Sequence, residues 1–140
     1  MVTKVFISHA SADTWVARQI ASHLHGRGAC TFLDEADIQT GDDFRERIIQ
    51  AETDCSELVV LLTPWSIKRS YVLFEISCFL HSRKRVVGIL HGLSAIEAMA
   101  DPVAGDLLVR RDLVDINGIE TYFDEIGARV AADTGTQANG

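Results

Sequence analysis

The chain alternates between short apolar runs and longer stretches in which apolar residues recur at helical spacing. The clearest run, Leu58–Leu62, is apolar throughout, as expected of a parallel strand that is covered on both faces. Shorter runs of the same kind predict four further strands, which are Val5–Ile7, Cys30–Leu33, Arg85–Leu90 and Leu113–Ile116. The pattern therefore predicts about five strands separated by helices.

The intervening stretches predict helices. They begin at Asp13, at Asp42, at Ser70 (a predicted N-cap) and at Ile119, and a further helical region over residues 94–108 is interrupted by Pro102 and Gly105. Strands that alternate with helices indicate an α/β domain, in which a parallel sheet carries helices on both faces. In such sheets ligands bind beyond the carboxyl ends of the strands.

Two more expectations come from the pattern. Trp15 and Trp65 are expected to pack in the core or between helices. Residues 1–132 are expected to form one folded domain, because the small polar residues of 133–140 are typical of a disordered tail or the start of a linker.

One acid stands in an otherwise apolar run. Glu75 lies within Val72–Leu80, and burying a carboxylate is costly unless something pairs with it. Such an acid is a candidate catalytic or binding residue. Tyr71 precedes it by one helical turn, on the same face. Polar residues that follow the predicted strands lie near the same rim, namely Ser8, His9, Asp34, Glu35, Thr63 and His91.

The composition of the chain argues against some classes of function. The 140 residues carry a net charge of −7, which argues against nucleic acid or an anionic membrane as the partner. No apolar stretch reaches the ~20 residues that cross a bilayer. The three cysteines are far apart and suit free thiols in a cytoplasmic protein. The acids Asp34, Glu35 and Asp37 are interpreted as a solvated loop, so neither a metal site nor a bound cofactor is expected.

A single buried carboxylate suits the stabilisation of a developing positive charge. Cleavage of a glycosidic bond creates an oxocarbenium-like ribosyl centre, which a preorganised anion favours. A pyridinium leaving group such as nicotinamide departs neutral and needs no proton. One acid then suffices where ordinary glycosidases use two.

Three segments resemble the Toll/interleukin receptor (TIR) domain family, particularly its bacterial members. Phe6–Asp13 is similar to the first box, F-I-S-[YH]-x-x-x-D, and Leu33–Asp42 is similar to the second-box loop, L-D-x-x-D-I-x-x-G. Thr63–Ser66 followed by Ser70–Glu75 resembles the segment S-x-W-x-x-x-E. The three boxes occur in order, and the resemblance covers roughly residues 4–131.

The resemblance implies a flavodoxin-like three-layer sandwich and, as in many bacterial and plant members, cleavage of NAD⁺ to nicotinamide and ADP-ribose or a cyclic ADP-ribose isomer. NAD⁺ is then a substrate and not a cofactor. The family's catalytic glutamate corresponds to Glu75, and an aromatic residue that is Trp in many members corresponds to Tyr71. The pocket positions of the first box correspond to Ser8 and His9.

The second-box loop, with Asp37 and Gly41, corresponds to the segment that gates the pocket and contacts a neighbouring subunit. The resemblance therefore implies self-association through residues 34–42, activity that depends on assembly, and a role in antiphage defence. A C-terminal sensor domain or partner protein is a further expectation.

Two alternatives stay open at this point. A non-catalytic adaptor that binds other TIR domains would need no acid in the apolar run. A nucleoside deoxyribosyltransferase-like enzyme shares the fold and a buried glutamate, but it would exchange nucleoside bases and leave NAD⁺ intact.

Overall fold

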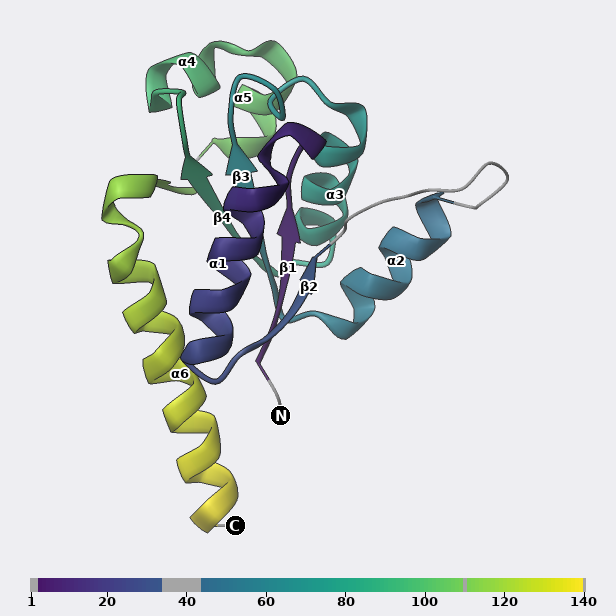
Figure 1. The fold of residues 1–140 in the computed structure, drawn as a ribbon. Helices are drawn as coiled ribbons and strands as arrows, with labels where there is room; N and C mark the ends of the chain where they lie inside the picture. The colour runs from purple at the N-terminus through teal and green to yellow at the C-terminus, as the bar shows by residue number, and fades with distance from the viewer. Residues whose placement is uncertain (1–2, 34–43, 110, 140) are drawn as a thin grey trace.

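The computed structural model describes residues 3–33, 44–109 and 111–139, and its centre is a parallel sheet of five strands (Figure 1). The strands are β1 (Lys4–Ser8), β2 (Cys30–Leu33), β3 (Glu57–Leu62), β4 (Arg85–Leu90) and β5 (Asp112–Asp115). Their spatial order, β2-β1-β3-β4-β5, is that of flavodoxin-like sheets. The predicted fold class is confirmed.

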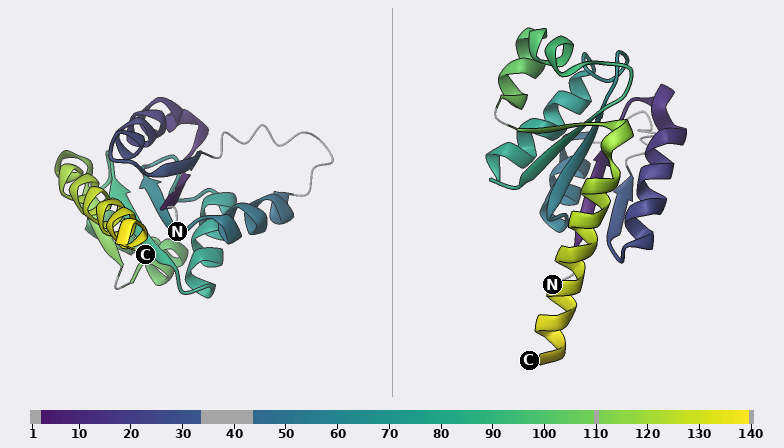
Figure 2. Two further views of the ribbon diagram at one scale, coloured as in Figure 1. Left: turned by 90° about the horizontal axis from the view of Figure 1, so that it is seen from below. Right: turned by 90° about the vertical axis from the view of Figure 1, so that its left-hand side faces the viewer.

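Helices cover both faces of the sheet. They are α1 (Thr14–Gly26), α2 (Phe44–Asp54), α3 (Ser70–His81), α4 (Ala95–Ala100), α5 (Pro102–Leu108) and α6 (Glu120–Asn139), with short 3₁₀ turns η1 (Ser11–Asp13) and η2 (Ile116–Gly118). Figures 1 and 2 show α1 and α6 side by side on one face and α3 on the other, with α4 and α5 above it. None of the helices in the described ranges is long and apolar enough to cross a membrane.

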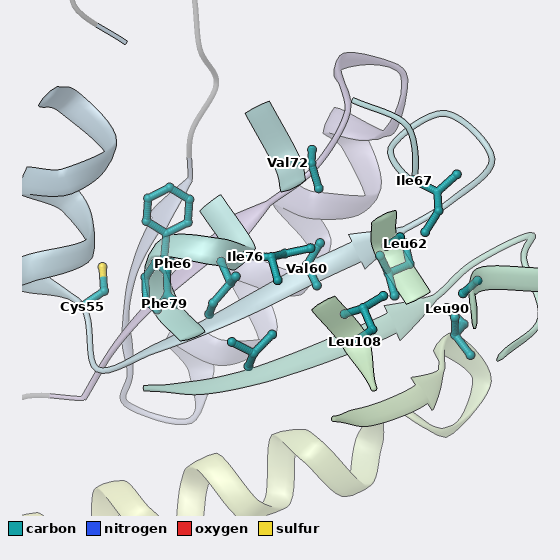
Figure 3. Close-up of a cluster of buried hydrophobic side chains, with 14 of the residues drawn as sticks. Phe6, Cys55, Val60, Leu62, Ile67, Val72, Ile76, Phe79, Leu90 and Leu108 are labelled. Carbon is teal, nitrogen blue, oxygen red and sulfur yellow. The ribbon is translucent and has the colours of Figure 1, made fainter. Parts of the chain in front are cut away.

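Alternate residues of the central strands feed two separate cores. Phe6, Val60 and Leu62 face α3, where they belong to one cluster with Ile76 and Phe79 (Figure 3). Residues of odd number on the same strands point to the other face and pack against α1 and α6; they are Val5, Ile7, Val59 and Leu61. Both faces of β3 are therefore dry, which explains its uninterrupted apolar sequence.

A buried acid fastens α6 to the amino-terminal edge of the sheet. Glu57, the first residue of β3, is 4 % exposed. It accepts a 2.7 Å hydrogen bond from the hydroxyl of Tyr122 and bonds of 2.9 and 3.0 Å from Arg129. Burial, and then the charge of Glu57, raise the pKa of Tyr122 well above its ordinary range, so this hydroxyl stays a donor.

Lys84 fastens α2 to the sheet in a similar way. The Lys84 ammonium lies 3.2 Å from the carboxylate of the buried Glu52. It also donates to the backbone carbonyls of Glu52 and, at 2.8 Å, of Cys55. A cation beside the last carbonyls of a helix is favourable, so Lys84 ties the end of α2 to the start of β4.

Both tryptophan predictions are wrong. Trp15 is 70 % exposed and Trp65 is 55 % exposed. The buried face of α1 is formed by Ala17, Ile20 and Leu24, and Trp15 stands outside that face. The presence of an aromatic residue in the first turn of an amphipathic helix does not show which side of the helix it occupies.

The ends of two helices also differ from expectation. The residue before α3 is Arg69 and makes no capping hydrogen bond with its side chain, so Ser70 is the first helical residue instead of the N-cap. Helix α6 continues through Asn139, where a disordered tail was expected. Ala131 and Ala132 favour helix, and Thr3 holds this part by donating a 3.2 Å hydrogen bond to Asp133.

The Glu57 cluster generates a stability prediction. We expect Tyr122→Phe to lower the free energy of unfolding by about 1.5–3 kcal/mol, because a buried carboxylate loses a hydrogen bond. Urea unfolding measures this change. The control is Glu120→Gln, since Glu120 is an exposed acid in an ion pair with Arg27 and should cost less than about 1 kcal/mol. Equal losses in the two variants would contradict the structural role of Tyr122.

Candidate functional site

The strand order reverses between β1 and β3. These strands are paired in parallel, with Ser8 opposite Val60, yet the chain leaves β1 toward β2 on one side and leaves β3 toward β4 on the other. The connections therefore diverge at the carboxyl ends and leave a crevice where open α/β sheets bind ligands. The candidate site lies here.

Glu75 is buried, as the sequence predicts. It lies in the second turn of α3 and is 1 % exposed. The other buried residues of this helix are apolar, namely Val72, Ile76 and Phe79. The site therefore holds a carboxylate in an apolar helix close to the carboxyl rim of the sheet.

Tyr71 connects α3 to the end of β1. Its hydroxyl donates a 3.2 Å hydrogen bond to the backbone carbonyl of His9. Burial raises the pKa of this hydroxyl, and the charge of Glu75 raises it further. Tyr71 therefore stays protonated beside Glu75 and fixes the distance between that helix and the first-box segment.

Ser8 and His9 form the β1 side of the site. Ser8 is fully buried, and its Oγ makes no hydrogen bond with any described residue. His9 is 4 % exposed, and its Nε2 lies 3.4 Å from the hydroxyl of Thr14. The structure thus brings Ser8, His9, Tyr71 and Glu75 to one place, although their roles stay predictions.

A buried hydrogen bond joins the two connections beside the candidate site, and the sequence interpretation missed it. The hydroxyl of Thr63, after β3, donates to the carboxylate of Asp13 in η1 over 2.6 Å. Both residues are buried. The Thr63 oxygen also accepts from the backbone N–H of Trp65 and Ser66. This bond joins the two connections that diverge from the switch point.

Ser66 completes the turn after β3. Its hydroxyl donates to the carbonyl of Leu61 over 2.6 Å and accepts from the backbone N–H of Thr63 over 2.9 Å. The turn is therefore held without help from solvent. Asp13 and Thr63 both lie in segments that carry the family resemblance, which marks each of them as a candidate site residue. Their spacing in the sequence does not indicate that they form a pair.

The second-box loop lies outside the described residues. Asp37 and Gly41 belong to it, as do the acids considered for a metal and the predicted start of the second helix at Asp42. Within the described ranges, no group of three or more His, Cys, Asp or Glu side chains is arranged to hold a metal ion. The four residues brought together therefore offer a buried carboxyl group, two hydroxyls and an imidazole, and an ionised carboxylate in such a set can stabilise positive charge on a bound ligand.

The Asp13–Thr63 bond yields a graded prediction. Thr63→Val keeps the side-chain shape but removes the donor to Asp13 and the acceptor for two N–H groups, so we expect a loss of about 2–3 kcal/mol in the free energy of unfolding. Thr63→Ser retains the hydroxyl and should lose less than about 1 kcal/mol. Urea unfolding of both variants tests the bond, and a Ser variant as unstable as the Val variant would contradict it.

Comparison with known proteins identifies the family of this chain. Residues 5–129 match the family of the TIR domain. Over 114 residues the sequence is 30 % identical to a probable 2′ cyclic ADP-D-ribose synthase of Brachypodium distachyon, and the match covers 79 % of this chain. It covers 51 % of that relative, so the chain spans about half the length of the curated protein it matches.

Solved structures of low identity share the fold. The TIR domain of the Toll-related receptor TRR-2 from Hydra magnipapillata superposes with a TM-score of 0.66 at 19 % identity, over 87 % of this chain and 96 % of that one. The TIR domains of the activated Roq1 resistosome superpose with a TM-score of 0.59 at 17 % identity, over 93 % and 84 % of the two chains. With the family match extending over nearly the whole sequence and the sheet order agreeing with it, the chain belongs to the TIR domain family.

Proposed function

We propose that this TIR domain cleaves NAD⁺ at the bond between nicotinamide and ribose. The observation that carries the proposal is the buried carboxylate of Glu75, beside Tyr71 and the end of β1 at the switch point of the sheet. The relative from Brachypodium distachyon, named as a probable 2′ cyclic ADP-D-ribose synthase, supports the same chemistry.

The proposed reaction uses the charge of Glu75. The glycosidic bond breaks with its electron pair going to the nicotinamide nitrogen, so the leaving group departs neutral. The ribosyl carbon that remains becomes cationic, and a carboxylate in a dry, preorganised site stabilises this charge more than water does. Water then adds and loses a proton to give ADP-ribose, or a hydroxyl of the same molecule adds and loses its proton to give a cyclic isomer.

The neighbouring residues would position the substrate. Ser8 offers a buried hydroxyl, and His9 offers a ring at the edge of the site. We assign Asp37 and Gly41 to the gate of the pocket on the family resemblance. No cofactor is required, because the cleaved bond belongs to NAD⁺ itself.

Activity is proposed to depend on self-assembly that includes the 34–42 loop. The proposed setting is antiphage defence in the cytoplasm, and a sensor domain or partner protein is the proposed trigger. The curated relative is about twice as long as the matched segment, which leaves room in that protein for additional parts.

The decisive experiment is product analysis by mass spectrometry at high protein concentration. We expect the wild type to release nicotinamide, and Glu75→Gln to be slower by at least about 10²–10³-fold, the effect of removing one preorganised electrostatic group. The matched control is Glu52→Gln, which alters another buried acid, paired with Lys84 at the opposite edge of the sheet. It should keep most of the activity.

Each outcome has a defined meaning. Equal activity of wild type and Glu75→Gln would remove Glu75 from the mechanism. Release of nicotinamide by neither protein, under conditions where the wild type is shown to be assembled, would favour a non-catalytic adaptor. Base exchange between nucleosides without action on NAD⁺ would identify the deoxyribosyltransferase alternative.

Tyr71 supplies a second prediction. Tyr71→Phe keeps the ring and removes the hydrogen bond to the carbonyl of His9. We expect kcat/KM for NAD⁺ to fall about 2–10-fold, the range for one hydrogen bond, whereas Tyr71→Ala also loses the aromatic face and should fall further. Steady-state kinetics measures both values, and circular dichroism checks that both variants fold. A Phe variant as impaired as the Ala variant would mean that the hydroxyl, and not the ring, is what the site requires.

A further inference from the structure

Helix α3 contacts the β1 segment at two levels, with Glu75 between them. Nearer the carboxyl rim of the sheet, the hydroxyl of Tyr71 donates to the backbone carbonyl of His9 over 3.2 Å. Farther from the rim, the rings of Phe79 and Phe6 pack with their centroids 5.5 Å apart (Figure 3). Because Tyr71, Glu75 and Phe79 are spaced by four residues, they share one face of the helix. Glu75 therefore faces β1 at a level between Phe6 and His9.

Ser8 is the β1 residue that points to Glu75 at this level. Successive side chains of a strand point to opposite faces of the sheet. Ile7 packs in the core against α1 and α6, whereas Phe6 packs in the core against α3. Ser8, two residues after Phe6, therefore points to the α3 side, as does Val60, its partner on β3. The hydroxyl of Ser8 and the carboxyl group of Glu75 thus lie on facing sides of the contact between β1 and α3.

The hydroxyl of Ser8 is a buried donor that the fold does not use. Ser8 is fully buried, and its Oγ makes no hydrogen bond with any residue in the described ranges. A buried hydroxyl without a partner costs free energy, and an apolar side chain of similar size would avoid that cost. The strand therefore keeps a hydrogen that can be donated at the level of Glu75.

The proposed cleavage requires an ionised carboxylate held in one orientation. Glu75 is 1 % exposed, and burial disfavours the charged form of a carboxyl group. The hydroxyl of Tyr71, on the same face of α3, already donates to the carbonyl of His9. A hydroxyl that donates to the carboxylate itself would favour its charged form, and charge-assisted bonds of this kind are about twice as strong as neutral ones.

We propose that Ser8 positions Glu75: its hydroxyl donates a hydrogen bond to the ionised carboxylate and holds it toward the ribosyl carbon of the substrate. This inference rests on the proposed cleavage of NAD⁺, and it gives Ser8 a role beyond a contact with the substrate. A serine hydroxyl rotates to suit its partner, and hydrogen bonds of catalytic groups are often poorly aligned in the free protein. Ionisation of Glu75 is therefore expected to draw in a hydroxyl that has no other partner among the described residues.

The kinetic test is Ser8→Ala. We expect kcat for release of nicotinamide to fall at least about tenfold, the effect of losing one hydrogen bond to a charged group, with little change in KM. The urea midpoint of unfolding should equal or exceed that of the wild type, because the lost hydroxyl has no partner in the fold. A wild-type kcat would overturn the proposal, as would a lower urea midpoint. A raised KM with unchanged kcat would identify a substrate contact instead.

A second measurement needs no NAD⁺. In protein with ¹³C-labelled glutamate, the carboxyl resonance of Glu75 is identified by its absence from Glu75→Gln and is followed as the pH changes. Its titration midpoint should lie at higher pH in Ser8→Ala than in the wild type, because the charged form has lost a donor. Every other charged group near Glu75 is the same in the two proteins, so the difference reports the hydroxyl.

The matched control is Ser77→Ala. Ser77 lies on the same helix, and its hydroxyl donates to the carbonyl of Leu73 over 2.9 Å. Two residues from Glu75, it does not share the face of that residue. It should leave both kcat and the titration midpoint of Glu75 unchanged. An unchanged midpoint in Ser8→Ala, or an equal change in Ser77→Ala, would overturn the proposal. A wild type that releases no nicotinamide would refute the proposed activity, while the titration would still decide whether Ser8 bonds Glu75.

Discussion

The hydrogen bond between Asp13 and Thr63 is the contact on which the candidate site depends. In a sheet of order 2-1-3-4-5, the connections after β1 and β3 leave in opposite directions, and in the described part of the chain the pairing of these strands ends at Ser8 and Val60. The bond spans that gap over 2.6 Å, with both partners buried. Because a hydrogen bond to a charged group in a dry site is strong, and an unpaired charged group there is costly, the pair holds the two connections together at the rim of the sheet.

Two of the buried acids fasten helices at the amino-terminal edge of the sheet. Glu57 and Glu52 lie toward the amino ends of the strands, and each is paired with a cation, Arg129 or Lys84. Such ion pairs offset the free-energy cost of burying the carboxylates, and they fasten α6 and α2 to the sheet. Glu75 lies at the opposite edge, where its charge acts on the Tyr71 hydroxyl. Asp13, bonded to Thr63, shows that a buried acid at this edge can also serve the fold, so the ligand role of Glu75 stays a proposal.

Local sequence patterns predicted most of the strands and helices, but they could not predict contacts between residues far apart in the chain. The central strands followed from apolar runs, because a strand covered on both faces must be apolar, and the burial of Glu75 followed from the apolar run around it. The Asp13–Thr63 bond joins residues 50 positions apart, and no periodicity pairs them. Trp15 was misplaced because hydrophobicity alone does not choose a helix face. The helix after residue 132 was missed because composition there suggested a tail, while the anchoring partner, Thr3, lies at the other end of the chain.

The same bond also lies close in sequence to two exposed tryptophans. Trp15 and Trp65 each lie two residues from one partner of the Asp13–Thr63 pair, and both are exposed. The exposed tryptophans and the candidate site therefore share these segments, since Tyr71 holds the same β1 connection through the carbonyl of His9. Coupling between two sites is reciprocal: if a contact at this exposed surface favours one arrangement of the site, a ligand that prefers that arrangement must favour the contact by the same factor.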